Sequence, residues 1–457
     1  MDRLSINDII KAVSGIGKNI KEKTIDNIVI DDRKVTPNCI FVAIKGERFD
    51  GHDFIESAID KGAAAIITER EIPLIPQIVV EDTKRALLDI ASFNRSRFSG
   101  MVVGVTGSVG KTTSKDMIAK VLSLKMHVLK TQGNLNNAIG LSKTLFGLDS
   151  SHQAAVIEMG MSNSGEISAL SQTSRPTVGV ITNIGVSHIE NLGSRDEILK
   201  SKLEILDGMS ESSPLIVGGD NDKLKNLVLP HNKIIKCGIE NEECDYRAFN
   251  IVSNGFDTEF DVEYKAGKTH VKIPTIGEHN VLNALFGFAV GILAKIEPEQ
   301  IAAALYTYEP TGMRQNISKI DGVTVIGDCY NASPDSMRAA LSSLMTIPCS
   351  GRRIAVLGDM LELGSIAQSS HIKVGELAAG FGVDFIYCYG DLAKYIYKGA
   401  LKCRELNDNV NNDNIAYFND KEALACKLKE VMKPGDAVLF KASRAIKLED
   451  VMQFIFK

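Results

Sequence analysis

A stretch from Val102 to Thr113 constrains the fold more than any other feature of this sequence. It is an apolar run that turns through glycines in the form Gly-x-x-Gly-Lys-Thr and then continues into apolar residues at helical spacing. A strand that turns tightly into a helix leaves free N–H groups at the helix N-terminus, where the dipole favours an anion. The stretch therefore predicts a phosphate loop that binds a nucleotide. The residues of this phosphate loop are Gly107, Ser108, Val109, Gly110, Lys111, Thr112 and Thr113.

Two side chains of the phosphate loop carry separate chemistry. Lys111 would place its positive charge on the β and γ phosphates, and the hydroxyl of Thr112 can ligate the Mg²⁺ that accompanies them. The general pattern has a further glycine five residues before Gly110, where this sequence has Val105. A plain glycine turn between strand and helix is the structural alternative, but it leaves the adjacent Lys-Thr unexplained.

Length and composition indicate a multidomain globular protein. The chain has 457 residues, which corresponds to about three domains of ~150 residues each. It is 24% charged with a formal net charge of -5, so neither nucleic acid nor an anionic membrane is favoured as a partner. We expect a monomer that acts on small molecules.

Cysteine usage and apolar runs indicate the compartment. The eight cysteines are scattered and form no Cys-x-x-Cys pair, as is usual for reduced thiols in a cytosol. The first residues contain no apolar signal core, and no apolar run is long enough to span a bilayer. We therefore expect a cytoplasmic protein without stable membrane insertion.

Strand and helix patterns divide the chain into three α/β units. Residues 1–82 alternate short apolar runs with polar turns and predict a small mixed α/β domain. Residues 83–312 contain a helix from Thr83 to Arg97, the phosphate loop and further apolar strands, which predict a P-loop ATPase-like domain with a buried parallel sheet. The alternating pattern between Phe256 and Ile273 predicts an antiparallel hairpin at the edge of that sheet.

In residues 313–457 a strand-then-helix rhythm restarts. The apolar runs 323–326, 354–357, 385–389 and 437–440 alternate with helical patterns such as 334–344, which predicts a Rossmann-like domain. No glycine-rich dinucleotide fingerprint follows its first strand, so this domain is expected to bind a substrate rather than NAD.

Polar residues that follow the central strands are candidates for the site. Glu158 ends one apolar strand and His188 comes shortly after the next, at the edge where α/β sheets bind ligands. A carboxylate there can hold Mg²⁺. Each residue also has a plain structural explanation, a turn cap for Glu158 and a hydrogen-bonded loop residue for His188.

Other candidates are ambiguous when taken singly. Lys202 lies in a helical pattern where a solvated lysine is the default explanation, and Asn137 lies in an asparagine-rich loop that can simply form a turn. Asn280 and Asn283 are one turn apart on a helix that begins at Glu278. Their amides can contact an adenine edge or cap the helix.

Taken together, these motifs resemble the Mur ligases over essentially the whole length. The shared segments are Asp31 to Pro37, Asp50 to His52, Thr106 to Thr113, Gly133 to Asn137, Glu158 to Met161 and His279 to Asn283. Two further segments, Tyr330 to Met337 and Leu357 to Gly364, resemble the family member that adds D-alanyl-D-alanine to UDP-N-acetylmuramoyl-tripeptide, a peptidoglycan precursor.

This resemblance implies roles for the candidate residues. ATP phosphates would bind Lys111, and Thr112, Glu158 and His188 would organise Mg²⁺. Lys202 falls where the family has a lysine that CO₂ carbamylates, giving an anion that can ligate metal. Asn280 and Asn283 would lie near the adenine, Arg314 near the phosphates, Asp328 near the ribose and Asn137 near the reacting carboxylate. The domain of residues 1–82 would bind the UDP-sugar and that of residues 313–457 the dipeptide.

The sequence departs from the family pattern at three positions. Gly327 stands where an aspartate usually precedes Asp328, Asp32 where Ser or Thr is common, and Ala442 where glycine is usual. These positions bear on contacts with the ribose, the uridine and the dipeptide. None of them removes a residue that phosphoryl transfer needs.

The reaction that the resemblance implies joins a carboxylate to an amine through an acyl phosphate formed with ATP. Two alternatives remain. One is a sister ligase, such as the enzyme that adds the third amino acid or a folylpolyglutamate synthase. The former shares the N-terminal motif, but its Asp-Asn-Pro-Arg signature is missing here. A nucleotide switch without ligase activity would need no UDP-sugar for ATP turnover.

Overall fold

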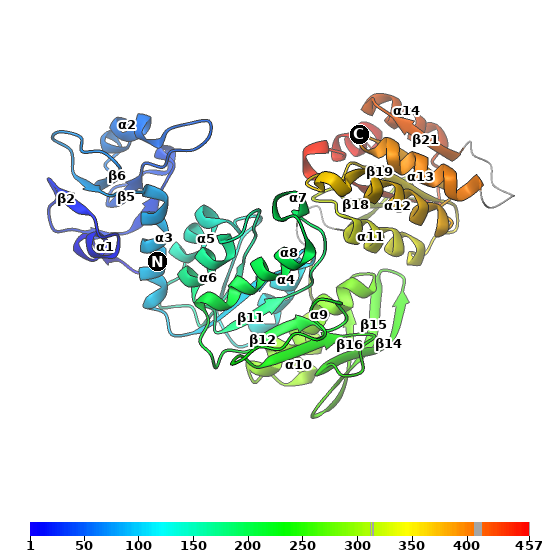
Figure 1. Cartoon of the computed structure of the whole chain (residues 1–457), viewed down its shortest axis with the longest axis horizontal. Coiled ribbons are helices and arrows are strands. Elements are labelled where there is room, and N and C mark those ends of the chain that lie inside the picture. The colour runs from blue at the N-terminus through cyan, green and yellow to red at the C-terminus, as the bar shows by residue number, and fades with distance from the viewer. Residues whose placement is uncertain (311, 313–314, 406–413, 457) are drawn as a thin grey trace.

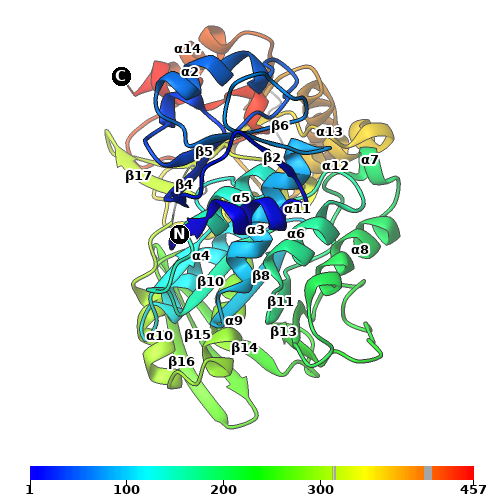
Figure 2. The same ribbon diagram turned by 90° about the vertical axis from the view of Figure 1, so that its left-hand side faces the viewer.

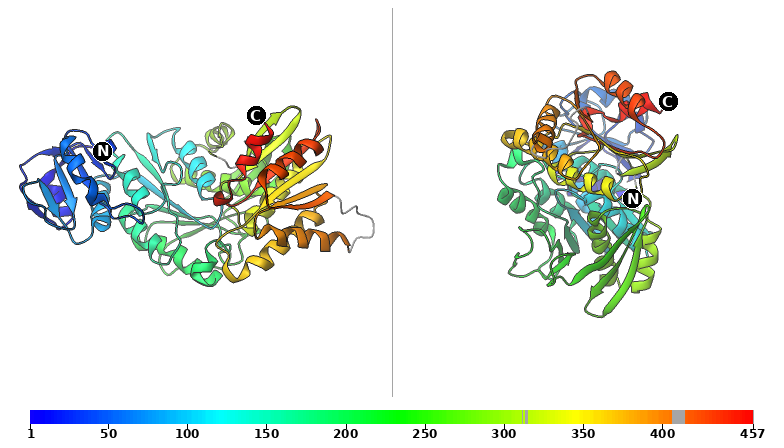
Figure 3. Two further views of the ribbon diagram at one scale, coloured as in Figure 1. Left: turned by 90° about the horizontal axis from the view of Figure 1, so that it is seen from above. Right: turned by 90° about the vertical axis from the view of Figure 1, so that its right-hand side faces the viewer.

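The computed structural model describes residues 1–310, 312, 315–405 and 414–456. Three main sheets follow one another along the long axis of the molecule, with the first and the third on opposite sides of the central one (Figure 1). Seen from above, the first and third sheets lie toward opposite ends of the molecule (Figure 3). In the described part of the chain, no helix is both long and apolar enough to cross a bilayer.

The first sheet has five strands in the order β2-β7-β6-β5-β4. Its strands are β2 (Ile16–Lys18), β4 (Asn27–Val29), β5 (Cys39–Val42), β6 (Ala65–Thr68) and β7 (Gln77–Val79). All neighbours are parallel except β2 and β7. A separate antiparallel pair, β1 (Leu4–Ser5) and β3 (Thr24–Ile25), and the helices α1 (Ile6–Ala12) and α2 (Ile55–Asp60) complete this part.

The central sheet has nine strands in the order β16-β15-β14-β13-β12-β11-β8-β10-β9. They are β8 (Met101–Thr106), β9 (Val128–Lys130), β10 (Ala154–Glu158), β11 (Val178–Ile181), β12 (Leu215–Gly218), β13 (Ile234–Gly238), β14 (Tyr246–Asn254), β15 (Asp257–Tyr264) and β16 (Gly267–Ile273). Strands β8 to β14 pair in parallel, and β15 and β16 continue the sheet as an antiparallel hairpin. The predicted parallel sheet and its edge hairpin are confirmed.

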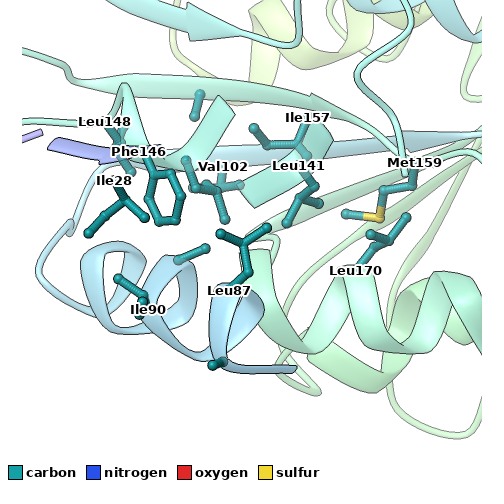
Figure 4. Packing of buried hydrophobic residues seen from close by; sticks show 14 of the residues in the cluster. Ile28, Leu87, Ile90, Val102, Leu141, Phe146, Leu148, Ile157, Met159 and Leu170 are labelled. Atoms are coloured by element: carbon teal, nitrogen blue, oxygen red, sulfur yellow. The ribbon is translucent and has the colours of Figure 1, made fainter. Parts of the chain in front are cut away.

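Helices cover both faces of the central sheet. They are α3 (Thr83–Ser96), α4 (Lys111–Leu122), α5 (Ala138–Phe146), α6 (Glu166–Ser174), α7 (Ile189–Leu192), α8 (Arg195–Leu203), α9 (Glu278–Leu293) and α10 (Pro298–Tyr306). One core packs β-strand residues against α4, α9 and α10, and the other packs them against α3, α5 and α6. In the second core, Leu87 and Ile90 of α3 lie beside Val102 and Leu141 (Figure 4).

Helix α3 joins the first sheet to the central sheet. It lies between the two in both side views (Figures 1 and 2). Ile28 of the first sheet belongs to the same buried cluster as Leu87 and Val102. The core therefore crosses the expected boundary between residues 82 and 83, and the three-domain division remains a prediction.

The third sheet has six strands in the order β17-β18-β22-β19-β20-β21. They are β17 (Asn316–Ile320), β18 (Val323–Asp328), β19 (Arg353–Gly358), β20 (Phe385–Tyr389), β21 (Ile415–Phe418) and β22 (Ala437–Lys441). Only β17 is antiparallel to its neighbour. Helices α11 (Pro334–Thr346), α12 (Ala367–Gly380) and α13 (Ala393–Glu405) cover one face, and α14 (Lys421–Val431) and α15 (Glu449–Ile455) the other. The predicted α/β rhythm is confirmed.

Local sequence fixes where α11 begins, close to the site. Ser333 caps the helix by accepting a hydrogen bond from the N–H of Ser336, whose hydroxyl in turn accepts one from the N–H of Ser333. Pro334 follows at the first helical position, where its fixed φ suits a helix and its missing N–H leaves no bond unmade. The N-terminus of α11 is thereby held at the edge that faces the central sheet.

Candidate active site

A cavity of ≈ 1020 Å³ lies between the carboxyl edge of the central sheet and the third sheet. Strands β8, β10 and β11 end at this edge, and parallel sheets bind ligands at such edges. The predicted site residues that line the cavity are Ser108, Val109, Gly110, Lys111, Thr113, Asn137, Glu158, His188, Asn280, Asn283 and Asp328. Gly107, Thr112 and Lys202 do not line it, and Arg314 lies outside the described residues.

The phosphate loop joins β8 to α4 and depends on two glycines. Gly110 has φ +82 and caps α4, a conformation that favours glycine. A Cβ on Gly107 would overlap the hydroxyl of Thr182. No side chain caps α4, so the first N–H groups of this helix are available to an anion. Lys111 folds back over the loop, with Nζ donating to the carbonyl of Gly107 at 2.8 Å.

A segment that follows β11 braces the phosphate loop, and the sequence interpretation missed it. The Oδ1 of Asn183 accepts hydrogen bonds from the N–H groups of Ser108 (3.1 Å) and Val109 (2.9 Å). The hydroxyl of Thr182 donates to the carbonyl of Val109 at 2.5 Å. The available signal was the position of these two polar residues directly after an apolar strand, which is the signal that singled out Glu158.

Glu158 is buried beside the phosphate loop. It is 1% exposed, and its Oε2 accepts a hydrogen bond from Thr112 Oγ1 at 2.8 Å. Its Oε1 accepts one from Nδ2 of Asn136 at 2.9 Å. Lys115, also buried, places Nζ 3.9 Å from Oε2. The carboxylate is thus held in one orientation by the loop, by a neighbouring amide and by a buried cation.

Two neighbouring residues of the asparagine-rich loop have different roles. Asn137, the residue singled out from the sequence, caps α5 through Oδ1, which accepts from the N–H of Gly140 at 2.9 Å. Asn136, which was not singled out, holds Glu158. Asn137 also lines the cavity.

Lys202 is buried, and the default expectation of a solvated lysine is wrong. It lies near the end of α8 and is 2% exposed. Burial, together with the nearby charge of Lys111, lowers the pKa of Lys202 well below its usual value. The amine is therefore driven toward its neutral, nucleophilic form.

His188 connects the two walls of the cavity. It has φ +64 and precedes α7, and its Nδ1 lies 2.6 Å from Oε2 of Glu362, which belongs to the loop after β19. This close contact with His188 lowers the pKa of Glu362. In the described part of the chain, no group of three or more His, Cys, Asp or Glu side chains forms a metal site by itself.

The N-terminus of α9 forms the wall beside Gly110. Asn283 Oδ1 accepts a hydrogen bond from Ser114 Oγ at 3.0 Å, and its Nδ2 donates to Oδ1 of Asn280 at 3.2 Å. Asn280 Nδ2 donates to Gln315 at 2.7 Å. Burial lowers the pKa of the adjacent His279 to about 4, so this histidine is neutral near pH 7. The wall is polar but uncharged.

Asp328 ends β18 on the opposite side. Lys441, which ends β22, is buried and donates to Oδ2 of Asp328 at 2.7 Å and to the carbonyl of Asn331 at 3.0 Å. The neighbouring strands therefore hold Asp328 by an ion pair, and its carboxylate lines the cavity.

Family models match three parts of the chain. They are the Mur ligase family catalytic domain at residues 24–95, the Mur ligase middle domain at residues 105–291, and the Mur ligase glutamate ligase domain at residues 313–444.

Relatives of known name match nearly the full length. The UDP-N-acetylmuramoyl-tripeptide--D-alanyl-D-alanine ligase of Bacillus subtilis is 38% identical, with 99% of this chain and 98% of the relative covered. The ligase of the same name from Escherichia coli is 34% identical, with 94% and 93% covered.

Solved structures agree with these matches. A crystal structure of MurF from Acinetobacter baumannii has a TM-score of 0.91 and 30% identity, and it covers 100% of this chain and 99% of that one. MurF from Thermotoga maritima in complex with ADP has a TM-score of 0.85 and 30% identity, with 94% and 96% covered.

Proposed function

The chain belongs to the Mur ligase family, and we propose that it is an ATP-dependent ligase that joins D-alanyl-D-alanine to UDP-N-acetylmuramoyl-tripeptide. The observation that carries this proposal is the cavity in which the phosphate loop faces the third sheet. Such a cavity can bring a nucleotide and a second substrate together. The named relatives supply the identity of the substrates.

ATP binds with its phosphates on the N-terminus of α4. Lys111 Nζ, which donates to the carbonyls of Gly107 and Ser108 in the loop, would turn to the phosphates. The adenine lies against Asn280 and Asn283, which hold each other and make this part of the wall polar but uncharged. The carboxylate of Asp328 would accept hydrogen bonds from the ribose hydroxyls, and Arg314 is assigned to the phosphates. The relative from Thermotoga maritima was solved with ADP, which supports this use of the cavity.

The residues beside the loop fit a divalent cation. Thr112 Oγ1 and Glu158 Oε2, which lie 2.8 Å apart, are hard oxygen donors of the kind that Mg²⁺ prefers, and His188 is the third residue of the set. When bound, Mg²⁺ would neutralise charge on the phosphates and on the transferring group.

Lys202 is proposed to react with CO₂. Its neutral amine attacks the carbon of CO₂, an N–C bond forms, one proton leaves, and an anionic carbamate results. The lowered pKa of Lys202 favours this step because only the neutral amine is a nucleophile. The carbamate oxygens would then ligate the metal or hold the γ-phosphate region.

The chemistry begins with the carboxylate of the tripeptide, which is a poor electrophile until it is activated. Its oxygen attacks the γ-phosphorus, the bond to the β–γ bridging oxygen breaks, and ADP leaves. Lys111 stabilises the charge on the transferring group, and Asn137 orients the carboxylate through Nδ2. The free amine of D-alanyl-D-alanine then attacks the acyl carbon, and phosphate leaves with the oxygen that came from the carboxylate.

The three parts of the chain have separate substrates. Residues 1–82 bind the UDP-sugar, residues 83–312 bind ATP, and residues 313–457 bind the dipeptide. Approach of the third sheet to the central sheet would exclude water that could hydrolyse the acyl phosphate. The protein is expected to work in the cytoplasm, where ATP is available, and as a monomer.

Ligation can be tested with the purified protein, ATP, Mg²⁺, UDP-N-acetylmuramoyl-tripeptide and D-alanyl-D-alanine. Phosphate release and product mass are followed while each component is omitted in turn, with tripeptides that carry either diaminopimelate or lysine. We expect phosphate release that requires both substrates and a pentapeptide product. Turnover without the UDP-sugar, or none with either tripeptide, would contradict the proposal.

A further inference from the structure

Asn183 has a side chain that the mechanism above does not use. It follows β11 in the same segment as His188, and it is partly buried at the wall of the cavity. Its Oδ1 accepts hydrogen bonds from two successive backbone N–H groups of the phosphate loop, those of Ser108 and Val109. Both N–H groups are therefore occupied by protein, and the phosphates are left with those further along, at the start of α4.

The two backbone donors fix the orientation of the carboxamide. An N–H group donates only to the oxygen of a carboxamide, so the oxygen must face the loop and Nδ2 must face away from it. Among the described residues, Nδ2 of Asn183 donates no hydrogen bond, and it is open to the cavity. Two N–H donors of known direction are thus presented to whatever the cavity binds.

The backbone that carries Asn183 is held on both sides. Thr182 Oγ1 donates to the carbonyl of Val109 at 2.5 Å, and the N–H of Gly185 donates to Ser108 Oγ at 2.9 Å. The carbonyl of Ile184 accepts a hydrogen bond from Nη2 of Arg195 at 2.7 Å. The position of the carboxamide is consequently set before any ligand arrives, as an effective donor to a developing charge requires.

We propose that Nδ2 of Asn183 donates a hydrogen bond to an oxygen of the terminal phosphoryl group of ATP. The nucleoside wall at α9 adjoins the loop at Gly110, where a Cβ would meet the side chain of Asn283. Asn183 instead contacts Ser108 and Val109 and shares its segment with His188. This inference rests on the proposed use of ATP, and it adds a catalytic residue whose donor is neutral.

Nucleotide binding tests the assignment without any need for ligation. Affinities of the wild type, Asn183→Asp and Asn183→Ala for ADP and for a non-hydrolysable ATP analogue are measured by calorimetry with Mg²⁺, after thermal unfolding has shown that the variants fold. Asp keeps an acceptor for the two loop N–H groups but removes both donors. We expect its affinity for the analogue to fall by about tenfold or more while that for ADP changes by less than about threefold.

The neutral variant separates hydrogen bonding from charge. Asn183→Ala loses the brace, so both affinities should fall, but the preference for the analogue over ADP should fall as well. Asn191→Asp is the matched control, because it makes the same change on α7 at a residue that does not line the cavity. It should leave the preference unchanged.

The outcomes are distinct. An unchanged preference for the analogue in both Asn183 variants would overturn the inference and leave Asn183 as a brace only. A reduced preference in Asn183→Asp alone would attribute the effect to repulsion and would also overturn it. A wild-type protein that binds neither nucleotide would overturn the proposed function itself.

Discussion

The wall of the cavity that carries the phosphate loop and the wall that faces it are held by different kinds of contact. The loop is fixed by buried or partly buried hydrogen bonds: Thr182 and the N–H of Gly185 donate to it, and Asn183 accepts from its backbone. The facing wall meets the central sheet through the pair of His188 with Glu362, which is 56% exposed, and also through the hydrogen bond from Asn280 to Gln315 and the buried side chain of Ile276. Exposed ion pairs contribute little and are screened by salt.

This difference matches two requirements of the reaction, stabilisation of charge and entry of substrates. Stabilising a transferring phosphoryl group requires donors that are already in place, because reorganising them during the reaction costs free energy. Substrates must also enter, and opening the partly exposed pair of His188 with Glu362 costs little free energy. Each prediction below perturbs one of the two walls.

The largest expected effect follows from Lys111→Ala on the phosphate-loop wall. Removing this charge should lower ATP turnover by a factor of about 10² or more, since it acts directly on the transferring group. Steady-state phosphate release measures this effect. Lys120→Ala is the control, because Lys120 is an exposed lysine on the same helix, α4. Near-normal turnover in Lys111→Ala would refute the role of the loop.

Lys202→Ala tests a buried residue behind the phosphate-loop wall. The variant should lose most of its activity, and short-chain carboxylic acids should restore part of it by supplying the oxygens of the missing carbamate. Initial rates with and without added acetate measure the rescue. Lys200→Ala, on the exposed side of α8, should behave as the wild type. Full activity of Lys202→Ala without acetate would exclude a carbamate at this position.

Glu362→Gln perturbs the facing wall and should have the smallest effect. Because the pair is exposed, we expect the KM for D-alanyl-D-alanine to rise by only about threefold, with kcat nearly unchanged. A fall in kcat of about a hundredfold would instead place Glu362 among the reacting groups and erase the contrast between the walls. Glu376→Gln on α12, which removes an exposed pair with Lys402 of α13, is the control.

The same contact should respond to pH. Pairing with His188 lowers the pKa of Glu362. Its contribution is therefore present above the ordinary pKa of a glutamate and is lost as the pH falls through the lowered value. Scattering with nucleotide bound should show the molecule becoming less compact over that acidic range in the wild type and no such change in Glu362→Gln. A wild-type profile that does not depend on pH there would contradict this role.

Some residues of the two walls could be identified from the sequence and others could not. Motif spacing identifies the phosphate loop and Glu158 because both lie directly at strand ends, and alternation identifies the hairpin of β15 and β16. Burial of Lys202 could not be predicted, because a lysine in a helical pattern looks the same whether its face is covered or solvated. The pairing of His188 with Glu362 joins segments far apart in the sequence, so no local pattern encodes it. The sequence also could not show which of the two neighbours Asn136 and Asn137 caps α5 and which one holds Glu158.

The central claim is that the phosphate loop transfers a phosphoryl group to a carboxylate. It is tested most directly with UDP-N-acetylmuramoyl-tripeptide whose reacting carboxylate carries ¹⁸O at both oxygens. After one turnover with ATP and D-alanyl-D-alanine, mass spectrometry of the released phosphate should find one ¹⁸O atom per molecule, transferred through the acyl phosphate. Phosphate without ¹⁸O, released alongside ligated product, would contradict the account.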